Sequence, residues 1–218
     1  MTALEKMDAF FEARLAGYDE HMMTGIEGAR EFYPFTASLL PQKRNAAVLD
    51  LGCGTGLELQ AYFALNDSAK VTAVDLSAAM LTALKGKFHD KDISIVRGSY
   101  FDVPFGESVF DAAVSVESLH HFKAERKTAL YRKVYAALKP DGVFVLTDYF
   151  AESEELEKEY SDTLERLKRE QGISDDAFYH YDTPLTVDHE TQTLETAGFS
   201  NISVMKNWGA TYTLMIRK

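Results

Sequence analysis

Three glycines at alternate positions follow a short apolar run near residue 50. The stretch reads Val48-Leu49-Asp50-Leu51-Gly52-Cys53-Gly54-Thr55-Gly56, and a helical pattern begins directly after it. Glycines tolerate positive φ angles and let a ligand lie against bare backbone. The amino end of the following helix offers free N–H groups and the positive end of a dipole. We therefore predict a ligand-binding loop at these glycines.

An acidic residue ends the next apolar run. Asp75 follows Val71-Thr72-Ala73-Val74, and a carboxylate at that place suits the two hydroxyls of a ribose. The dinucleotide fingerprint G-x-G-x-x-G/A requires a small third residue, whereas this chain has Leu57 there. The spacing therefore disfavours a dinucleotide and favours a different ribose-containing cofactor.

The pattern Asp50-x-Gly52-x-Gly54-x-Gly56 resembles motif I of the class I S-adenosylmethionine-dependent methyltransferases. Segments resembling the later motifs of that family follow in order at 71–81, 98–105, 110–122 and 138–145. The resemblance implies S-adenosylmethionine as cofactor and S-adenosylhomocysteine as product. It identifies the fold and the cofactor, and it leaves the acceptor open. Residues 11–22 are similar to the opening of small-molecule methyltransferases, where this segment closes over the cofactor.

The resemblance also implies a role for each matching residue. Asp75 would bind the ribose hydroxyls, and Leu76 would pack on the adenine. Ser99 stands where an aspartate commonly meets the adenine amino group, so Ser99 or Asp102 would make that contact. Asp50 would either contact the amino acid part of the cofactor or orient the glycine loop. The remaining implied cofactor residues are Gly52, Cys53, Gly54, Gly56, Met80, Tyr100, Glu117 and Tyr18.

Candidate catalytic residues follow the fourth apolar run. His120 and His121 would lie at the carboxyl edge, where open α/β sheets place their ligands. Because adjacent histidines usually point apart, we expect at most one to face the acceptor, as a base or a contact. The alternative is a capping or packed histidine.

Two further groups are candidate acceptor or lid contacts. Arg14 shares a helical face with Tyr18, although an ion pair with a neighbouring carboxylate is the alternative for the arginine. The cluster Tyr179-His180-Tyr181 would contribute acceptor contacts or simply aromatic packing.

The elements that position these residues alternate along the chain. Apolar runs at 47–51, 71–74, 93–96, 110–116 and 143–146 are separated by helical patterns near 55–66, 77–88 and 124–138. Continuous apolar runs with intervening helices predict a parallel sheet buried on both faces. This is a doubly wound α/β fold. The resemblance to the methyltransferases implies that the sheet of this fold has seven strands, mostly parallel, with an antiparallel last strand.

Four segments follow from this reading. Residues 1–41 form an N-terminal helical lid, and residues 42–150 form a Rossmann-like cofactor-binding core. Residues 151–187 are a helical insertion that also serves as a lid. Residues 188–218 supply a helix and strands that complete the same sheet. Between 152 and 190 there are 13 acidic and 4 basic residues, which predicts a solvated helix face.

Composition limits the function classes. The 218 residues carry a net charge of −11, which disfavours nucleic acid and anionic lipid as partners. The single cysteine, Cys53, excludes an intramolecular disulfide and a multi-thiolate metal site, and we expect a small buried thiol rather than a nucleophile. No paired metal-ligand spacing is present, so we predict no metal. The absence of a signal-like start and of a long apolar run predicts a cytoplasmic protein.

The resulting hypothesis is in-line methyl transfer to a small-molecule acceptor by a monomer or homodimer. A general base is needed only where the acceptor must lose a proton. Two alternatives stay open: a tRNA or protein methyltransferase, and a non-catalytic sensor of S-adenosylmethionine. An exposed basic patch would favour the first, but the candidate residues are scattered: Lys85, Lys87, Lys91, Arg97 and Arg126.

Overall fold

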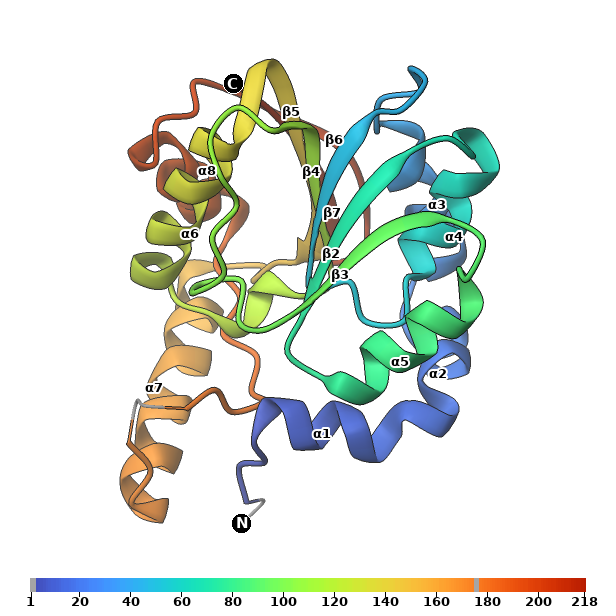
Figure 1. Ribbon diagram of the computed structural model, residues 1–218. Helices are drawn as coiled ribbons and strands as arrows, with labels where there is room; N and C mark the ends of the chain where they lie inside the picture. Colours follow the sequence, from blue (N-terminus) through green and yellow to red (C-terminus); the bar gives the residue numbers. More distant parts are fainter. Residues whose placement is uncertain (1–2, 175–176) are drawn as a thin grey trace.

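A single seven-stranded sheet forms the centre of the computed structural model, which describes residues 3–174 and 177–218 (Figure 1). The strands lie in the order β3-β2-β1-β4-β5-β7-β6. Strands β1 to β5 pair in parallel, and β7 is antiparallel to both β5 and β6. The predicted mostly parallel sheet with an antiparallel last strand is therefore confirmed. The strands are β1 (Ala47–Leu51), β2 (Lys70–Asp75), β3 (Asp92–Arg97), β4 (Phe110–Val116), β5 (Leu138–Tyr149), β6 (Asn201–Trp208) and β7 (Thr211–Arg217).

Helices cover both faces of this sheet (Figure 1). Helices α3 (Ala29–Ser38), α4 (Leu57–Leu65) and α5 (Ala78–Lys87) pack on one face, and α6 (Ala124–Ala137) and α8 (Val187–Thr196) pack on the other. Every residue of the central strand β4 is buried, as expected of a strand covered on both sides.

The N-terminal segment lies across the carboxyl ends of the strands. It consists of α1 (Met7–Arg14), a 3-10 turn at Leu15–Gly17 and α2 (Tyr18–Gly25). The helical face predicted for Arg14 and Tyr18 is thus interrupted by the 3-10 turn, at a point where Gly17 has low helix propensity. The break turns α2 away from α1, so that the N-terminal segment follows the edge of the sheet.

The inserted segment runs outward and then returns. Helix α7 (Glu154–Gln171) begins at Ser153, whose hydroxyl accepts from Leu156 N, and ends at Gly172 with φ 63°. Leu164 is the residue of α7 that is buried, so the helix is the solvated acidic face that the sequence predicts. Figure 1 shows α7 extending away from the sheet.

The returning chain lies beside the residues that precede α1. Backbone N–H groups of Met7 and His180 donate to Phe178 O and Glu5 O, respectively. The part of the insertion that reaches the carboxyl edge is therefore the stretch after Phe178. The lid roles of the two segments remain predictions. No helix in the described part of the chain is long and apolar enough to cross a membrane.

Candidate active site

The glycine loop connects β1 to α4 and presents bare backbone. Gly52 has φ 74°, and a Cβ there would lie 2.1 Å from Ser118 Oγ, so a larger residue does not fit. Gly54 N donates to Asp75 Oδ2 at 2.9 Å, and Ser77 N donates to Asp75 Oδ1 at 2.8 Å. Asp75 thus holds the loop against the end of β2.

A first cavity of about 620 Å³, counted with its open mouth, lies over this loop. The aromatic rings of Tyr100, Phe101, Phe122 and Phe178 form one side of it, and α1 contributes Met7 and Phe11. Nine predicted cofactor residues line the cavity: Tyr18, Gly52, Gly54, Asp75, Leu76, Met80, Ser99, Tyr100 and Glu117. A narrow apolar cavity beside the half-buried carboxylate of Asp75 fits an adenine and its ribose.

The other predicted cofactor residues lie behind the loop. Cys53 is buried, and burial raises the pKa of its thiol well above the ordinary value, so the thiol is a poor nucleophile. A Cβ on Gly56 would lie 2.7 Å from the Phe88 ring, so this glycine serves helix packing. Asp50 is buried beneath the loop, and Asp102 is exposed outside the cavity.

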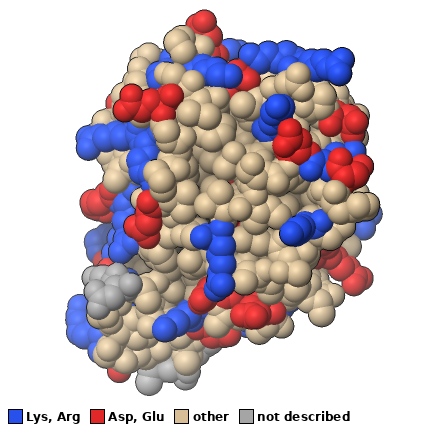
Figure 2. Space-filling view, in the orientation of Figure 1, with Lys and Arg blue, Asp and Glu red and all other residues tan. Residues whose placement is uncertain are grey.

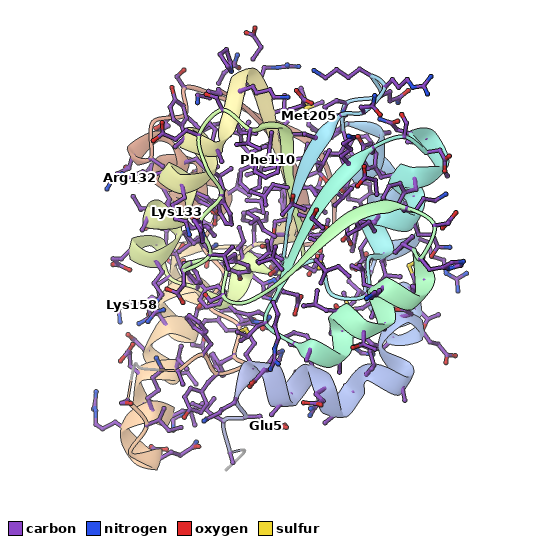
Figure 3. The ribbon with its side chains drawn as sticks, in the orientation of Figure 1. Glu5, Phe110, Arg132, Lys133, Lys158 and Met205 are labelled. Carbon is purple, nitrogen blue, oxygen red and sulfur yellow. The ribbon has the colours of Figure 1, made fainter. Side chains whose placement is uncertain are left out.

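Lys133 supports the segment that closes the aromatic side. Its Nζ donates to the backbone carbonyls of Tyr100, Phe101 and Val103 at 2.9, 2.7 and 2.9 Å. Figure 3 shows Lys133 on α6, beside this segment. A side chain that satisfies three carbonyls fixes a loop that has no helix of its own.

A second cavity lies beside the first. Its lining includes Arg14, Tyr149, His180 and Asp182. The two cavities share Phe11, Tyr18, Glu117 and His121. Groups bound in the two cavities would therefore lie on either side of the same four residues.

Two buried histidines lie at that wall. His120 Nδ1 lies 2.5 Å from Asp148 Oδ1. Burial favours a neutral ring, but the carboxylates of Asp148, Asp182 and Glu117 outweigh it and raise the pKa of His120 to about 9. Burial and the neighbouring charge of His120 lower the pKa of His121, whose Nδ1 lies 3.1 Å from Asp182 Oδ1. At neutral pH the site thus holds one cationic and one neutral imidazole.

The expectation that the two histidines point apart was wrong. Their ring centroids are 4.1 Å apart, and both rings line the second cavity. Asp182 Oδ1 lies 3.6 Å from His120 Nε2 and 3.1 Å from His121 Nδ1. The physical reason is the 3-10 turn Leu119–His121, which replaces the extended backbone on which neighbouring side chains alternate.

Glu117 occupies a strained position between the cavities. Its φ is 48°, which is uncommon for a residue other than glycine. Burial raises the pKa of its carboxyl to about 7, and Thr211 Oγ1 donates to its Oε1 at 3.1 Å. Residues held in such conformations cluster at ligand sites.

Comparison with known proteins agrees with this geometry. Residues 48–142 match the family model described as "Methyltransferase domain". This span contains the glycine loop, Asp75, Glu117 and both histidines. Residues 48–142 are thus a methyltransferase domain, and the fold is that of the class I S-adenosylmethionine-dependent methyltransferases.

Three proteins illustrate the relationship. The carboxy-S-adenosyl-L-methionine synthase of Helicobacter hepaticus is 25% identical over 95% of this chain and 94% of its own. The 24-methylenesterol C-methyltransferase 3 of Arabidopsis thaliana is 26% identical over 60% of this chain, but the match spans 37% of that enzyme. A candidate O-methyltransferase of Nostoc punctiforme superposes with a TM-score of 0.73 at 20% identity, over 98% of this chain and 62% of its own.

The residues predicted as acceptor or lid contacts in this methyltransferase separate into two groups. Arg14 forms an ion pair with Glu5 at 3.0 Å and lies 3.6 Å above the Phe10 ring, at the edge of the second cavity. His180 stacks on the same ring at 3.5 Å and also lines that cavity. Tyr179 and Tyr181 line neither of the two cavities.

Several residues of the site were missed from the sequence. Asp148 is the last residue but one of β5, at the same edge as Glu117, so the rule that ligands bind at carboxyl ends could have indicated it. Asp182 lies in an irregular segment without a motif. Asp19 accepts from Thr55 Oγ1 at 2.5 Å and bonds Lys87 Nζ, which joins α2 to the glycine loop and to α5.

The methyltransferase also brings together side chains that could ligate an ion. One such group is His120, His121 and Asp182, and another is Glu117, His120 and Asp148, each with ligand atoms within 4.8 Å of one another. Neither group has a spacing visible in the sequence. The absence of a metal from the reaction stays a prediction.

Proposed function

We propose that this methyltransferase transfers the methyl group of S-adenosylmethionine to a small, neutral or cationic acceptor held in the second cavity. The observation that carries the proposal is the shared wall of Phe11, Tyr18, Glu117 and His121. Two ligands held on either side of one shared wall would satisfy the main need of an in-line displacement, which is alignment of the acceptor with the methyl group.

The first cavity is the cofactor site of this proposal. Asp75 holds the ribose hydroxyls, Leu76 and Met80 contact the adenine, and Tyr18 faces the methionine end from α2. When bound, S-adenosylmethionine supplies an electrophilic methyl group on a sulfonium that leaves as a thioether. The chain itself orients the acceptor, excludes water and handles the acceptor's proton.

His121 is the group that accepts this proton. Its pKa is lowered, so its ring is neutral near pH 7. Because Nδ1 faces Asp182, Nε2 is the nitrogen that takes the proton from the acceptor. His120 is held as a cation by Asp148 and cannot act as a base.

The charges of the second cavity favour neutral or cationic acceptors. Glu117 and Asp182 contribute carboxyl groups, whereas the two cations of this cavity are already paired, His120 with Asp148 and Arg14 with Glu5. Figure 2 shows Lys and Arg alternating with Asp and Glu around the rim of the displayed face, which has a largely uncharged centre. This distribution offers no support for a tRNA acceptor.

A second candidate function rests on the nearly full-length match to a carboxy-S-adenosyl-L-methionine synthase. In that case the chain would carboxylate the cofactor instead of transferring its methyl group. The carboxyl of Glu117 lies on the shared wall and would repel a carboxylate held beside it, while the cation of His120 is already paired with Asp148, and this favours methyl transfer.

Mass spectrometry of reactions with methyl-labelled S-adenosylmethionine tests the proposal. A panel of small amines, phenols and thiols serves as acceptors, with tRNA and a protein lysate as comparison. We expect label in a small acceptor and stoichiometric S-adenosylhomocysteine. Label in tRNA or protein alone, a carboxylated cofactor, or cofactor binding without any turnover would each contradict it, and the last would favour a sensor.

A further inference from the structure

One carboxylate oxygen on the wall between the two cavities lacks a hydrogen-bond partner. The side chain of Glu117 is 8% exposed and lines both cavities. Its Oε1 accepts from Thr211 Oγ1 at 3.1 Å, whereas its Oε2 has no hydrogen bond within the described part of the chain. The ion-pair partner of Oε2 is His120 Nδ1, at 3.9 Å, and that nitrogen already contacts Asp148 at 2.5 Å. Oε2 is therefore free to accept a donor from a bound ligand.

The backbone holds this carboxylate in place. Glu117 directly follows β4, and its φ of 48° turns the chain at that point. Its N–H donates to Thr147 O of β5 at 2.9 Å, and the hydroxyl that binds Oε1 comes from Thr211, the first residue of β7. Because two neighbouring strands fix it, the side chain has little freedom to lose when a ligand binds.

Acids outnumber cations around the second cavity. Arg14 is paired with Glu5 at 3.0 Å. His120 lies between two carboxylates, with Asp148 at 2.5 Å and Asp182 at 3.6 Å. The carboxyl on the shared wall adds a fourth acid to these three, against two cations. A bound group that carries a positive charge is therefore attracted to this wall.

Aromatic rings surround the same place. The ring centroid of Phe11 lies 6.1 Å from that of Tyr18, 6.3 Å from that of His121 and 5.6 Å from that of His180. These four residues line the second cavity together with Tyr149. Aromatic faces attract cations and also pack against apolar groups. The lining thus suits a positive charge on an aromatic body.

We infer that the acceptor is a primary or secondary amine on an aromatic body, and that Glu117 binds its ammonium group through Oε2. The inference rests on the proposed function and narrows the acceptor to one chemical class. Alcohols, phenols and thiols bring no positive charge to the wall, and a carboxylate is repelled by it. Glu117 is therefore the residue that selects the acceptor.

Methyl transfer to such an amine needs one proton to leave first. The bound ammonium gives a proton to Nε2 of His121 and becomes a neutral amine. Its nitrogen lone pair then forms the bond to the methyl carbon while the carbon–sulfur bond breaks, and the electrons of that bond go to sulfur. The methylated product keeps one positive charge beside Glu117, and the proton on His121 passes to solvent.

Two probes of the same shape test the inference on the chain loaded with S-adenosylhomocysteine. 2-Phenylethylamine carries an ammonium group where 2-phenylethanol carries a hydroxyl. Calorimetric titration should show that the native chain binds the amine at least about tenfold more tightly than the alcohol, because a charge-assisted hydrogen bond is formed. This comparison needs no variant, so it decides the inference even if a substitution prevents folding.

The variant Glu117→Gln assigns the preference to one residue. Its preference for the amine over the alcohol should disappear, and the loss in affinity for the amine should be at least about tenfold greater than any loss for S-adenosylhomocysteine. In turnover, the label of methyl-labelled S-adenosylmethionine should appear on the nitrogen of the amine, with a raised KM in the variant. The matched control is Glu125→Gln, which alters an exposed glutamate outside both cavities and should keep the preference.

Three results would overturn the inference while the proposed function stands. The first is equal affinity of the native chain for the amine and the alcohol. The second is an equal loss of affinity for the amine and for S-adenosylhomocysteine in Glu117→Gln, which would place Glu117 in the cofactor site. The third is methylation of phenols or thiols with amines left unmodified. Label in tRNA or protein alone would instead remove the proposed function as well.

Discussion

The imidazole of His120 and the carboxylate of Asp148 form a buried contact of 2.5 Å between the turn after β4 and the end of β5. The pKa of His120 is raised to about 9. A histidine whose pKa is higher in the folded than in the unfolded state stabilises the folded protein while it is protonated. For His120 this stabilisation is complete below the ordinary histidine pKa of 6.5, and it is lost as pH rises through about 9. Asp148 has a lowered pKa, so its own contribution is lost in acid.

We expect His120→Gln to remove this alkaline dependence. The native chain should lose roughly 3 kcal/mol of unfolding free energy relative to the variant between pH 7 and pH 10. Denaturant titrations at a series of pH values measure the difference. Parallel curves for the two proteins would show that His120 is not charged in the folded state.

Replacing His121 should affect turnover more than cofactor binding. His121→Asn is expected to lower kcat by about 10²–10⁴, as for loss of a general base, while the affinity for S-adenosylhomocysteine stays unchanged. Because the pKa of His121 is lowered, the native kcat should stay constant near neutral pH and fall only in acid. His189→Asn, a change at a histidine on α8 away from both cavities, serves as the control. Normal kcat in His121→Asn would remove the base from the mechanism.

Asp19 should set the rate at which the cofactor leaves. It joins α2 to Thr55 and Lys87, so Asp19→Asn should free the N-terminal segment and increase the off-rate of S-adenosylhomocysteine several-fold. Stopped-flow displacement measures this rate. The matched change Asp162→Asn breaks the exposed ion pair with Lys158 and should leave the rate unaltered. Lys158 is labelled on α7 in Figure 3. Equal off-rates in all three proteins would contradict a lid role for α2.

The metal prediction can be tested at the histidine cluster. Methyl transfer should persist after dialysis against a chelator, and elemental analysis should find less than one equivalent of metal per chain. Loss of activity that Zn²⁺ or Mn²⁺ restores would show that His120, His121 and Asp182 act as ligands.

Local pattern was sufficient to predict the sheet and the position of the glycine loop at its carboxyl edge. Alternating apolar runs and helices determine a parallel sheet, and Gly52, Gly54 and Asp75 lie on two consecutive strand ends whose order follows from that topology. Nine of the predicted cofactor residues line the first cavity for this reason.

The acceptor side could not be predicted in the same way. Asp148 and Asp182 reach His120 and His121 across 28 and about 60 residues of chain, and no periodic pattern encodes such contacts. The direction of the two histidine rings depends on a single 3-10 turn, which spacing alone does not reveal.

Calorimetric titration with S-adenosylhomocysteine, using NADH as the control ligand, tests the central claim most directly. The native chain should bind S-adenosylhomocysteine and not NADH, and Asp75→Ala should weaken that binding by more than about 1.5 kcal/mol through loss of a charge-assisted contact. Binding of NADH instead, or unchanged affinity in Asp75→Ala, would contradict the assignment of the glycine loop and Asp75 to the methyl donor.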